Sequence, residues 1–196
     1  MAVDLYLASG SPRRQELLQQ LGVAFAVRVA DVVEEPGAEE TASDFVTRLA
    51  LAKAQAIWQA LADEARRPVL GADTEVVLDK QILGKPRNRE HGIEMLQMLS
   101  GRTHQVLTGV ALIAQQSSVC VNVSEVTFRK LDNDEIARYW DTGEPVGKAG
   151  GYAIQGYAAA FIEYLRGSYS GVMGLPLFET ATLLRQNHIP IWQSKK

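Results

Sequence analysis

Short apolar runs alternate with longer stretches of helical periodicity along this chain of 196 residues. The N-terminal part is typical of the pattern: the apolar run at about 4–8 predicts a strand, and leucines at helical spacing predict a helix over 12–21. Ser11 and Pro12 are favoured as the cap and the first residue of a helix, and Gly22 suits a left-handed C-terminal cap. The sequence therefore opens with a strand and a well-delimited helix.

The same alternation continues through the rest of the chain, where a second apolar run covers 23–33. Because both hairpins and helical crossovers are needed, the pattern predicts an α/β fold with a mixed, twisted sheet and flanking helices. No repeat or linker interrupts it, so we expect one domain over residues 1–196. Helices are predicted from a cap at Thr41 or Ser43 to about Leu61, over about 89–100 and 132–141, and after Pro176. Strands are predicted at about 69–72, 103–115, 118–130 and 158–165, with a hairpin of 75–78 and 81–83 around Asp79-Lys80.

Composition and charge narrow the class of protein. Hydrophobic residues make up 46% and charged residues 22% of the chain, as in globular proteins. A net charge of −3, without a basic and aromatic stretch, argues against a nucleic-acid partner. The apolar runs fall short of the roughly 20 residues of a membrane span, and Asp4 is unlike the basic start of a signal peptide. With Cys120 as the only cysteine, we expect no disulfide, no membrane partner and a cytoplasmic location.

Arg13 and Arg14 are unusual in the first turn of a predicted helix. A helix N-terminus carries about half a positive charge, which disfavours each arginine by about 0.3–1 kcal/mol. In one interpretation both lie along the surface with their head groups in water. In the other, their guanidinium groups converge with Ser9, Ser11 and backbone N–H groups on a phosphate, which helix N-termini bind readily.

Lys53 occupies an apolar stripe of its predicted helix, in series with Phe45 and Leu49. Either it lies at the edge of the stripe with its ammonium group in water, or the ammonium group points into a cleft towards an anion. The acidic pair Glu34-Glu35 ends the second apolar run. It is either a solvated turn or a source of carboxylate for a hard cation such as Mg²⁺, which prefers one or two carboxylates plus substrate phosphates.

Asp73 and Thr74 directly follow the apolar run 69–72. In α/β proteins, ligand chemistry gathers at the carboxyl ends of strands, although an aspartate there is also common as a turn or cap residue. Lys85 lies between Gly84 and Pro86, where the glycine lets the backbone approach a ligand and the proline stiffens the loop. An ordinary turn lysine is the alternative.

Five short motifs follow one another along nearly the whole chain. They are Ala8-Ser9-Gly10-Ser11-Pro12-Arg13-Arg14, Gly71-Ala72-Asp73-Thr74, Gly84-Lys85-Pro86, Lys148-Ala149-Gly150-Gly151-Tyr152-Ala153-Ile154-Gln155-Gly156 and Val172-Met173-Gly174-Leu175-Pro176. Together they resemble the motifs of the Maf nucleotide pyrophosphatases. The resemblance implies an α/β fold related to the inosine-triphosphate pyrophosphatases, with two lobes around a deep cleft. It also implies hydrolysis of nucleoside triphosphates to the monophosphate and pyrophosphate with a divalent cation, Mg²⁺ or Mn²⁺.

The same resemblance implies roles for single residues. Asp73 corresponds to the catalytic base and shares the metal site with Glu34, for which the adjacent Glu35 is the alternative. The phosphate-binding residues that the resemblance implies are Ser9, Arg14, Lys53 and Lys85.

The partners of Arg14, Lys53 and Lys85 are expected to arrive only with the substrate. Replacing one of these three cationic side chains should therefore leave thermal stability nearly unchanged.

Three further positions, Arg13, Thr74 and Gln155, separate the branches of the family. Their combination resembles the branch that acts on dTTP and UTP, with modified pyrimidine nucleotides as further candidates. The branch that acts on 7-methyl-GTP has a different residue in place of Arg13 and a glutamine in place of Thr74. An amide such as that of Gln155 offers a donor and an acceptor that match uracil and thymine, although it could also merely brace its glycine-rich loop.

Two other functions remain open. Members of the family have also been described as inhibitors of septum formation, so a non-enzymatic cell-division regulator with a protein or nucleic-acid partner is the alternative. A phosphatase that removes the terminal phosphate would release orthophosphate instead of pyrophosphate. A homodimer is plausible for the family, although no sequence feature indicates one.

Overall fold

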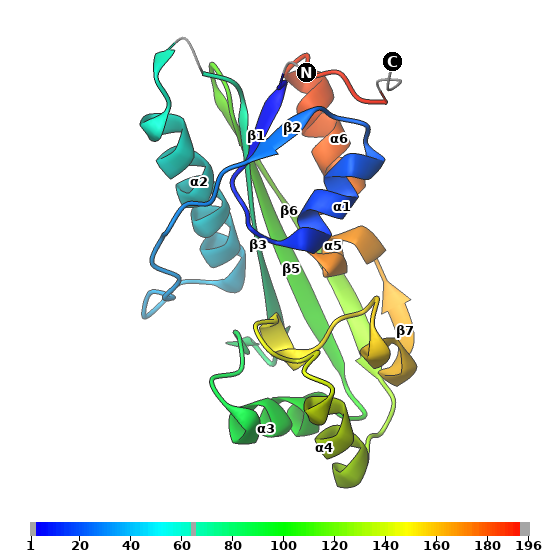
Figure 1. Cartoon of the computed structure of the whole chain (residues 1–196). Coiled ribbons are helices and arrows are strands. Elements are labelled where there is room, and N and C mark those ends of the chain that lie inside the picture. Colours follow the sequence, from blue (N-terminus) through cyan, green and yellow to red (C-terminus); the bar gives the residue numbers. More distant parts are fainter. Residues whose placement is uncertain (1–2, 64–65, 193–196) are drawn as a thin grey trace. The chain divides into compact units, whose positions relative to one another are not determined.

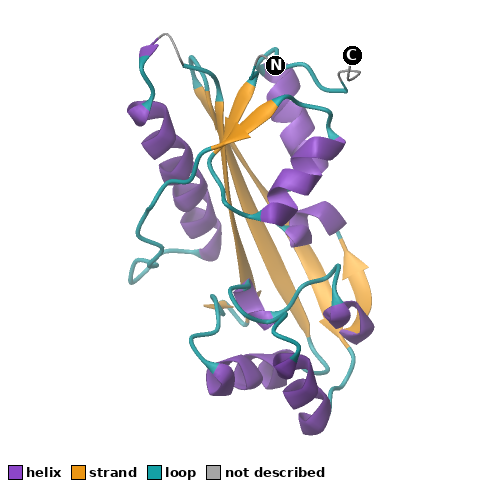
Figure 2. Cartoon of the chain, in the orientation of Figure 1, coloured by secondary structure: helices purple, strands orange, loops and turns teal. Residues whose placement is uncertain are grey.

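The strands form one mixed sheet (Figure 1, Figure 2). They are β1 (Leu5–Leu7), β2 (Phe25–Val27), β3 (Val69–Leu78), β4 (Gln81–Ile82), β5 (Thr103–Ile113), β6 (Ser117–Phe128) and β7 (Ile162–Arg166). The computed structural model describes residues 3–63 and 66–192, and within them the order is β2-β1-β3-β5-β6-β7, with β4 paired to β3. Parallel pairing joins β1 to β2 and β3, whereas β3–β4 and β6–β7 are antiparallel. The predicted α/β fold with a mixed sheet is confirmed.

The first two α-helices begin at caps that the sequence predicted. Ser11 Oγ accepts the Arg14 N–H at 3.5 Å, and Thr41 Oγ1 accepts the Asp44 N–H at 3.1 Å. None of the helices in the described part of the chain is long and apolar enough to cross a bilayer. The α-helices are α1 (Pro12–Gln20), α2 (Ala42–Ala60), α3 (Arg89–Leu99), α4 (Asn133–Asp141), α5 (Tyr169–Met173) and α6 (Leu177–Gln186). Two 3₁₀ helices, η2 (Ala149–Gly151) and η3 (Tyr157–Phe161), lie between α4 and β7.

The described residues divide into two compact units. Among the described residues, the first unit comprises 3–63, 66–73, 108–122 and 174–192, and the second comprises 74–107 and 123–173. In the first unit, Figure 1 shows α2 on one side of the sheet and α1 with α6 on the other. The expectation of one domain over the whole chain stays a prediction.

In the first unit, the backbone of α2 approaches the backbone of β3 and β5 closely, at two glycines. A Cβ atom at Gly71 would lie 2.1 Å from the carbonyl oxygen of Ala50, and one at Gly109 would lie 2.4 Å from another carbonyl oxygen of α2. Only glycine permits an approach this close. Because Gly71 is two residues from Asp73, and Ala50 is one helical turn from Lys53, this contact brings the two charged side chains together.

The core of the second unit contains a histidine among aromatic rings. The ring of His104 lies edge to face with those of Phe128 and Tyr152, at centroid distances of 5.1 and 5.4 Å. His104 Nε2 and the Tyr152 hydroxyl oxygen are 2.8 Å apart. Only 2% of the His104 surface is exposed, and burial lowers its pKa from 6.5 to about 4. His104 is therefore neutral near pH 7.

This burial predicts an acid-sensitive fold. The pKa of His104 in the folded protein lies below that of the unfolded chain, so the stability it confers is complete above pH 6.5 and declines as the pH falls towards 4. The free energy of unfolding should fall by about 3 kcal/mol over this range through this residue alone. Denaturant titrations at several pH values measure the free energy of unfolding of the wild type and of His104→Gln. If this free energy depends on pH in the same way in both proteins, the loss of stability in acid does not come from His104.

Asp73 and Thr74 lie inside a strand, contrary to the prediction that they follow one. β3 continues without a break to Leu78, and all of its residues except Thr74 are buried. Aspartate usually ends a strand because its charge is costly to bury. Here Lys53 pairs with the carboxylate, so the strand passes through Asp73.

Other boundaries also differ from the prediction. The apolar run 23–33 contributes only β2, and Val29 and Val33 beyond it are 69% and 74% exposed in a loop. The strand predicted at 158–165 begins as η3 before β7, and α5 was not predicted. The β3–β4 hairpin is confirmed, since Asp79 and Lys80 both have the positive φ of a tight hairpin turn.

Candidate active site

The loop before α1 brings hydroxyl groups and a guanidinium group together in the first unit. Ser9 Oγ accepts hydrogen bonds from the Ser11 N–H at 3.3 Å and from Arg14 Nη1 at 3.2 Å. Arg14 Nε donates to the carbonyl oxygen of Gly174 at 2.8 Å. Arg14 is thus oriented by the protein rather than extended into water, and Arg13 beside it is half-buried.

A buried lysine links two carboxylates in the same unit. Lys53 Nζ lies 2.7 Å from Asp73 Oδ1 and 2.5 Å from Glu34 Oε1. Lys53 is 8% exposed and Asp73 6%, whereas 37% of the Glu34 side chain is exposed. The interpretation with the ammonium group in water is therefore wrong. The expectation that its partners arrive only with the substrate is also wrong, because two of them belong to the protein.

The second carboxylate oxygen of Asp73 points to a further ligand. Oδ2 is buried and has no hydrogen-bond partner among the residues that the structure describes. A buried carboxylate oxygen without a donor is unfavourable, so the atom suits a bound water molecule or a cation. Glu34 and Asp73 both contact the ammonium nitrogen of Lys53, so their carboxylates lie close enough to bind one metal ion together.

A metal ion at this place would need ligands from the substrate. Within residues 3–63 and 66–192, no group of three or more His, Cys, Asp or Glu side chains could hold one. Mg²⁺ commonly takes one or two carboxylates and completes its shell with water and phosphate oxygens. Glu34 and Asp73 fit that pattern.

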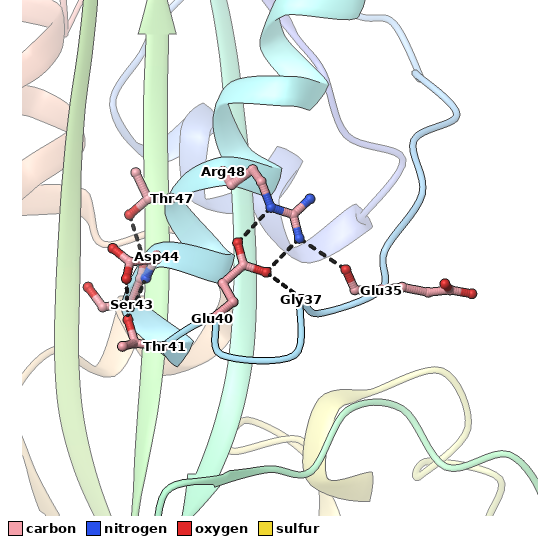
Figure 3. A network of polar contacts seen from close by, with 8 residues as sticks. All are labelled: Glu35, Gly37, Glu40, Thr41, Ser43, Asp44, Thr47 and Arg48. Carbon is pink, nitrogen blue, oxygen red and sulfur yellow. Dashed lines mark hydrogen bonds and ion pairs between the residues drawn. The ribbon is translucent and has the colours of Figure 1, made fainter.

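An ion pair fixes the loop that carries Glu34 (Figure 3). The Arg48 guanidinium donates to both carboxylate oxygens of Glu40, at 2.6 and 2.7 Å, and to the carbonyl oxygen of Glu35 at 3.0 Å. The Gly37 N–H also donates to Glu40, at 3.0 Å. These hydrogen bonds, that from Arg48 first, lower the pKa of Glu40 to about 2. Figure 3 shows the Glu35 carboxylate pointing away from the network, and of the two adjacent acids it is Glu34 that reaches Lys53.

In the second unit, the loops that carry Lys85 and Gln155 are joined. The Gly150 N–H donates to the carbonyl oxygen of Gly84 at 2.8 Å. Gly150 has a φ of +64°, and a Cβ atom there would lie 2.9 Å from a valine side chain of β3, so glycine is required for both reasons. Lys85 and Gln155 are exposed, and Thr74 is half-buried on β3.

The sequence did not reveal how the loop before α2 is held. Arg48 and Glu40 are eight residues apart on either side of a helix start, and no periodic spacing marks such a pair. Their two-point contact forms only when the loop folds back along the helix. The candidate site residues could be singled out from the sequence, but this contact could not.

Comparisons with known proteins identify the family of this chain. Residues 4–187 match the family described as Maf-like protein. The chain is 58% identical over 188 residues to the dTTP/UTP pyrophosphatase of Alkalilimnicola ehrlichii, covering 94% of this chain and 93% of that protein. It is 49% identical over 195 residues to the dTTP/UTP pyrophosphatase of Saccharophagus degradans, covering 98% and 93%.

A solved structure shares the fold at much lower sequence identity. The Staphylococcus aureus Ham1 protein aligns with a TM-score of 0.52 and 12% identity, covering 94% of this chain and 98% of that one. This likeness concerns the fold alone. The family match and the two full-length relatives go further, and on them the chain belongs to the Maf family.

Proposed function

We propose that this protein hydrolyses nucleoside triphosphates, preferring dTTP and UTP, to the nucleoside monophosphate and pyrophosphate. The observation that carries the proposal is the buried Lys53–Asp73 pair, with Glu34 beside it and one Asp73 oxygen left without a donor among the described residues. Relatives named dTTP/UTP pyrophosphatase, 49% and 58% identical over nearly the full chain, support the substrate class.

Asp73 is the general base of this proposal. Lys53 holds Oδ1, which leaves Oδ2 to accept a proton from the attacking water. Glu34 and Asp73 would hold Mg²⁺ or Mn²⁺, which, when bound, would polarise a phosphate oxygen and offset developing negative charge. Their proximity to one ammonium group supports this assignment.

Each unit, taken by itself, offers cations to which phosphate oxygens of the substrate could bind. In the first unit, Arg14 with Ser9 and the ammonium group of Lys53 offer donors to phosphate oxygens. In the second, the exposed Lys85 follows a glycine that lets the backbone approach a ligand. Donors placed where charge develops stabilise the transition state more than the ground state.

The proposal includes a cytoplasmic location, a nucleoside triphosphate as substrate and no membrane or nucleic-acid partner, and it leaves a homodimer open. Cys120 is a free thiol, and burial, with Glu179 nearby, raises its pKa to about 11. With a single cysteine the chain forms no internal disulfide, which suits a reducing compartment.

Gln155 is expected to set base selectivity, together with Arg13 and Thr74. Gln155→Ala removes the amide that pairs with thymine or uracil, so the advantage of dTTP over GTP in kcat/KM should narrow by about 10–100-fold. The best rate should fall less than the selectivity. The measurement is kcat/KM for dTTP, UTP, CTP and GTP in both forms, with Gln97→Ala, an exposed glutamine of α3, as the control. An equal loss on all four substrates would mean that Gln155 only braces its loop.

A further inference from the structure

The carboxylate of Glu144 holds the segment that follows Gln155. Its Oε2 accepts the Tyr157 N–H at 2.8 Å, and its Oε1 accepts the Ala158 N–H at 3.1 Å and the Tyr139 hydroxyl at 2.9 Å. Burial, and next the contact with Glu144, raise the pKa of the Tyr139 hydroxyl, which therefore remains a donor. Hydrogen bonds to an ionised acceptor are stronger than neutral ones, so the start of η3 is firmly tied to Glu144.

Gly156 makes room for this carboxylate. A Cβ atom at position 156 would lie 2.0 Å from Glu144 Oε2 and 2.5 Å from its Cδ. The φ of Gly156 is −108°, which lies outside the left-handed region. The glycine is therefore explained by the carboxylate that occupies the place of a side chain.

The other side of Gln155 is also fixed within the same unit. The Tyr152 hydroxyl is 2.8 Å from Nε2 of the buried His104, and Tyr152, Ala153 and Ile154 are buried. Gln155 itself is exposed. An exposed amide thus lies between two segments whose positions are set by hydrogen bonds and burial.

We propose that Glu144 is a positioning residue for base selectivity. Its carboxylate lies where a side chain at Gly156 would lie and accepts the Tyr157 and Ala158 N–H groups. These hydrogen bonds fix the backbone after Gln155 and so set the direction of the Gln155 amide towards the base. The inference rests on the proposed function, in which Gln155 contacts the base. Discrimination by a hydrogen-bonding group requires a fixed geometry, because a mobile amide can turn to suit either a donor or an acceptor.

Two variants remove the contact from opposite sides. Glu144→Gln replaces one acceptor oxygen with an NH₂ group, and Gly156→Ala pushes the carboxylate away from the N–H groups. Each should lower the dTTP-to-GTP ratio of kcat/KM by about tenfold. The double variant should lower the ratio no further, because both substitutions break the same contact. Tyr139→Phe is the matched control: it takes one donor from the carboxylate, leaves both backbone contacts, and should keep the ratio within about twofold.

Both substrates are assayed on one preparation, so the ratio does not depend on how much of a variant is folded. Additive losses in the double variant, or an unchanged ratio in both single variants while Gln155→Ala lowers it, would overturn the role of Glu144 and leave the proposed function intact. If the wild type prefers dTTP and Gln155→Ala leaves the dTTP-to-GTP ratio of kcat/KM unchanged, Gln155 does not select the base. The inference about Glu144 would then fail, because it requires that contact. A wild type that hydrolyses no nucleoside triphosphate would instead overturn the proposed function.

Discussion

Replacing Asp73 with asparagine is expected to lower kcat by about 10²–10⁴-fold, the usual contribution of a positioned general base. Asparagine has nearly the same size but cannot accept a proton from the attacking water. Its oxygen can still accept the hydrogen bond that Lys53 Nζ donates to Asp73 Oδ1 at 2.7 Å, so the fold should survive. The measurement is kcat for dTTP at saturating Mg²⁺, normalised to folded protein.

Asp141→Asn is the control for this substitution. Asp141 is an exposed carboxylate at the end of α4 whose contact with Arg89, at 3.4 Å, lies on the surface. Its removal should leave kcat unchanged, since exposed ion pairs contribute little. If Asp73→Asn stayed within about threefold of the wild type, Asp73 would not be the general base.

Lys53→Met should impair both activity and stability. Methionine keeps the length and apolar character of the lysine stem but removes the charge between Asp73 and Glu34. Removing one partner of a buried ion pair leaves the other charge uncompensated, so the free energy of unfolding should fall by about 3 kcal/mol. Denaturant unfolding above pH 6.5, where His104 is neutral in both states, measures this change.

A second substitution separates lost charge from lost packing. In the double variant Lys53→Met with Asp73→Asn, no carboxylate remains buried without its cation, so most of the lost stability should return. Lys130→Met, at an exposed lysine, should have no effect. A Lys53→Met protein as stable as the wild type would mean that the Lys53–Asp73 contact does not stabilise the fold.

Much of the fold could be predicted because local signals and tertiary structure agree. The cap at Ser11 and the hairpin turn at Asp79 and Lys80 lie where the residue types indicated. The break predicted at Asp73 failed because a distant residue, Lys53, makes a buried carboxylate tolerable in the middle of β3. The local sequence pattern around Asp73 does not reveal an ion-pair partner that lies 20 residues away in the sequence.

The candidate site shows the same division. Residue types singled out Lys53 and the acidic pair Glu34-Glu35 as candidates, and the family resemblance then pointed to Glu34. That Lys53 contacts Asp73 depends on the close backbone approach of α2 to β3 at Gly71, which no periodicity encodes. The contacts of Glu144 with the segment after Gln155 were also invisible in the sequence, because they need the missing side chain of Gly156 and two backbone N–H groups from a separate segment.

The central claim is that water attacks the α-phosphorus of a pyrimidine nucleoside triphosphate. Hydrolysis of dTTP by the purified protein with Mg²⁺ in water enriched in oxygen-18, followed by mass spectrometry of the products, tests it most directly. Attack at the α-phosphorus by a water that Asp73 deprotonates gives equal amounts of dTMP and pyrophosphate, with the heavy oxygen in dTMP. Release of orthophosphate with dTDP, or the heavy oxygen in pyrophosphate instead of dTMP, would contradict the account.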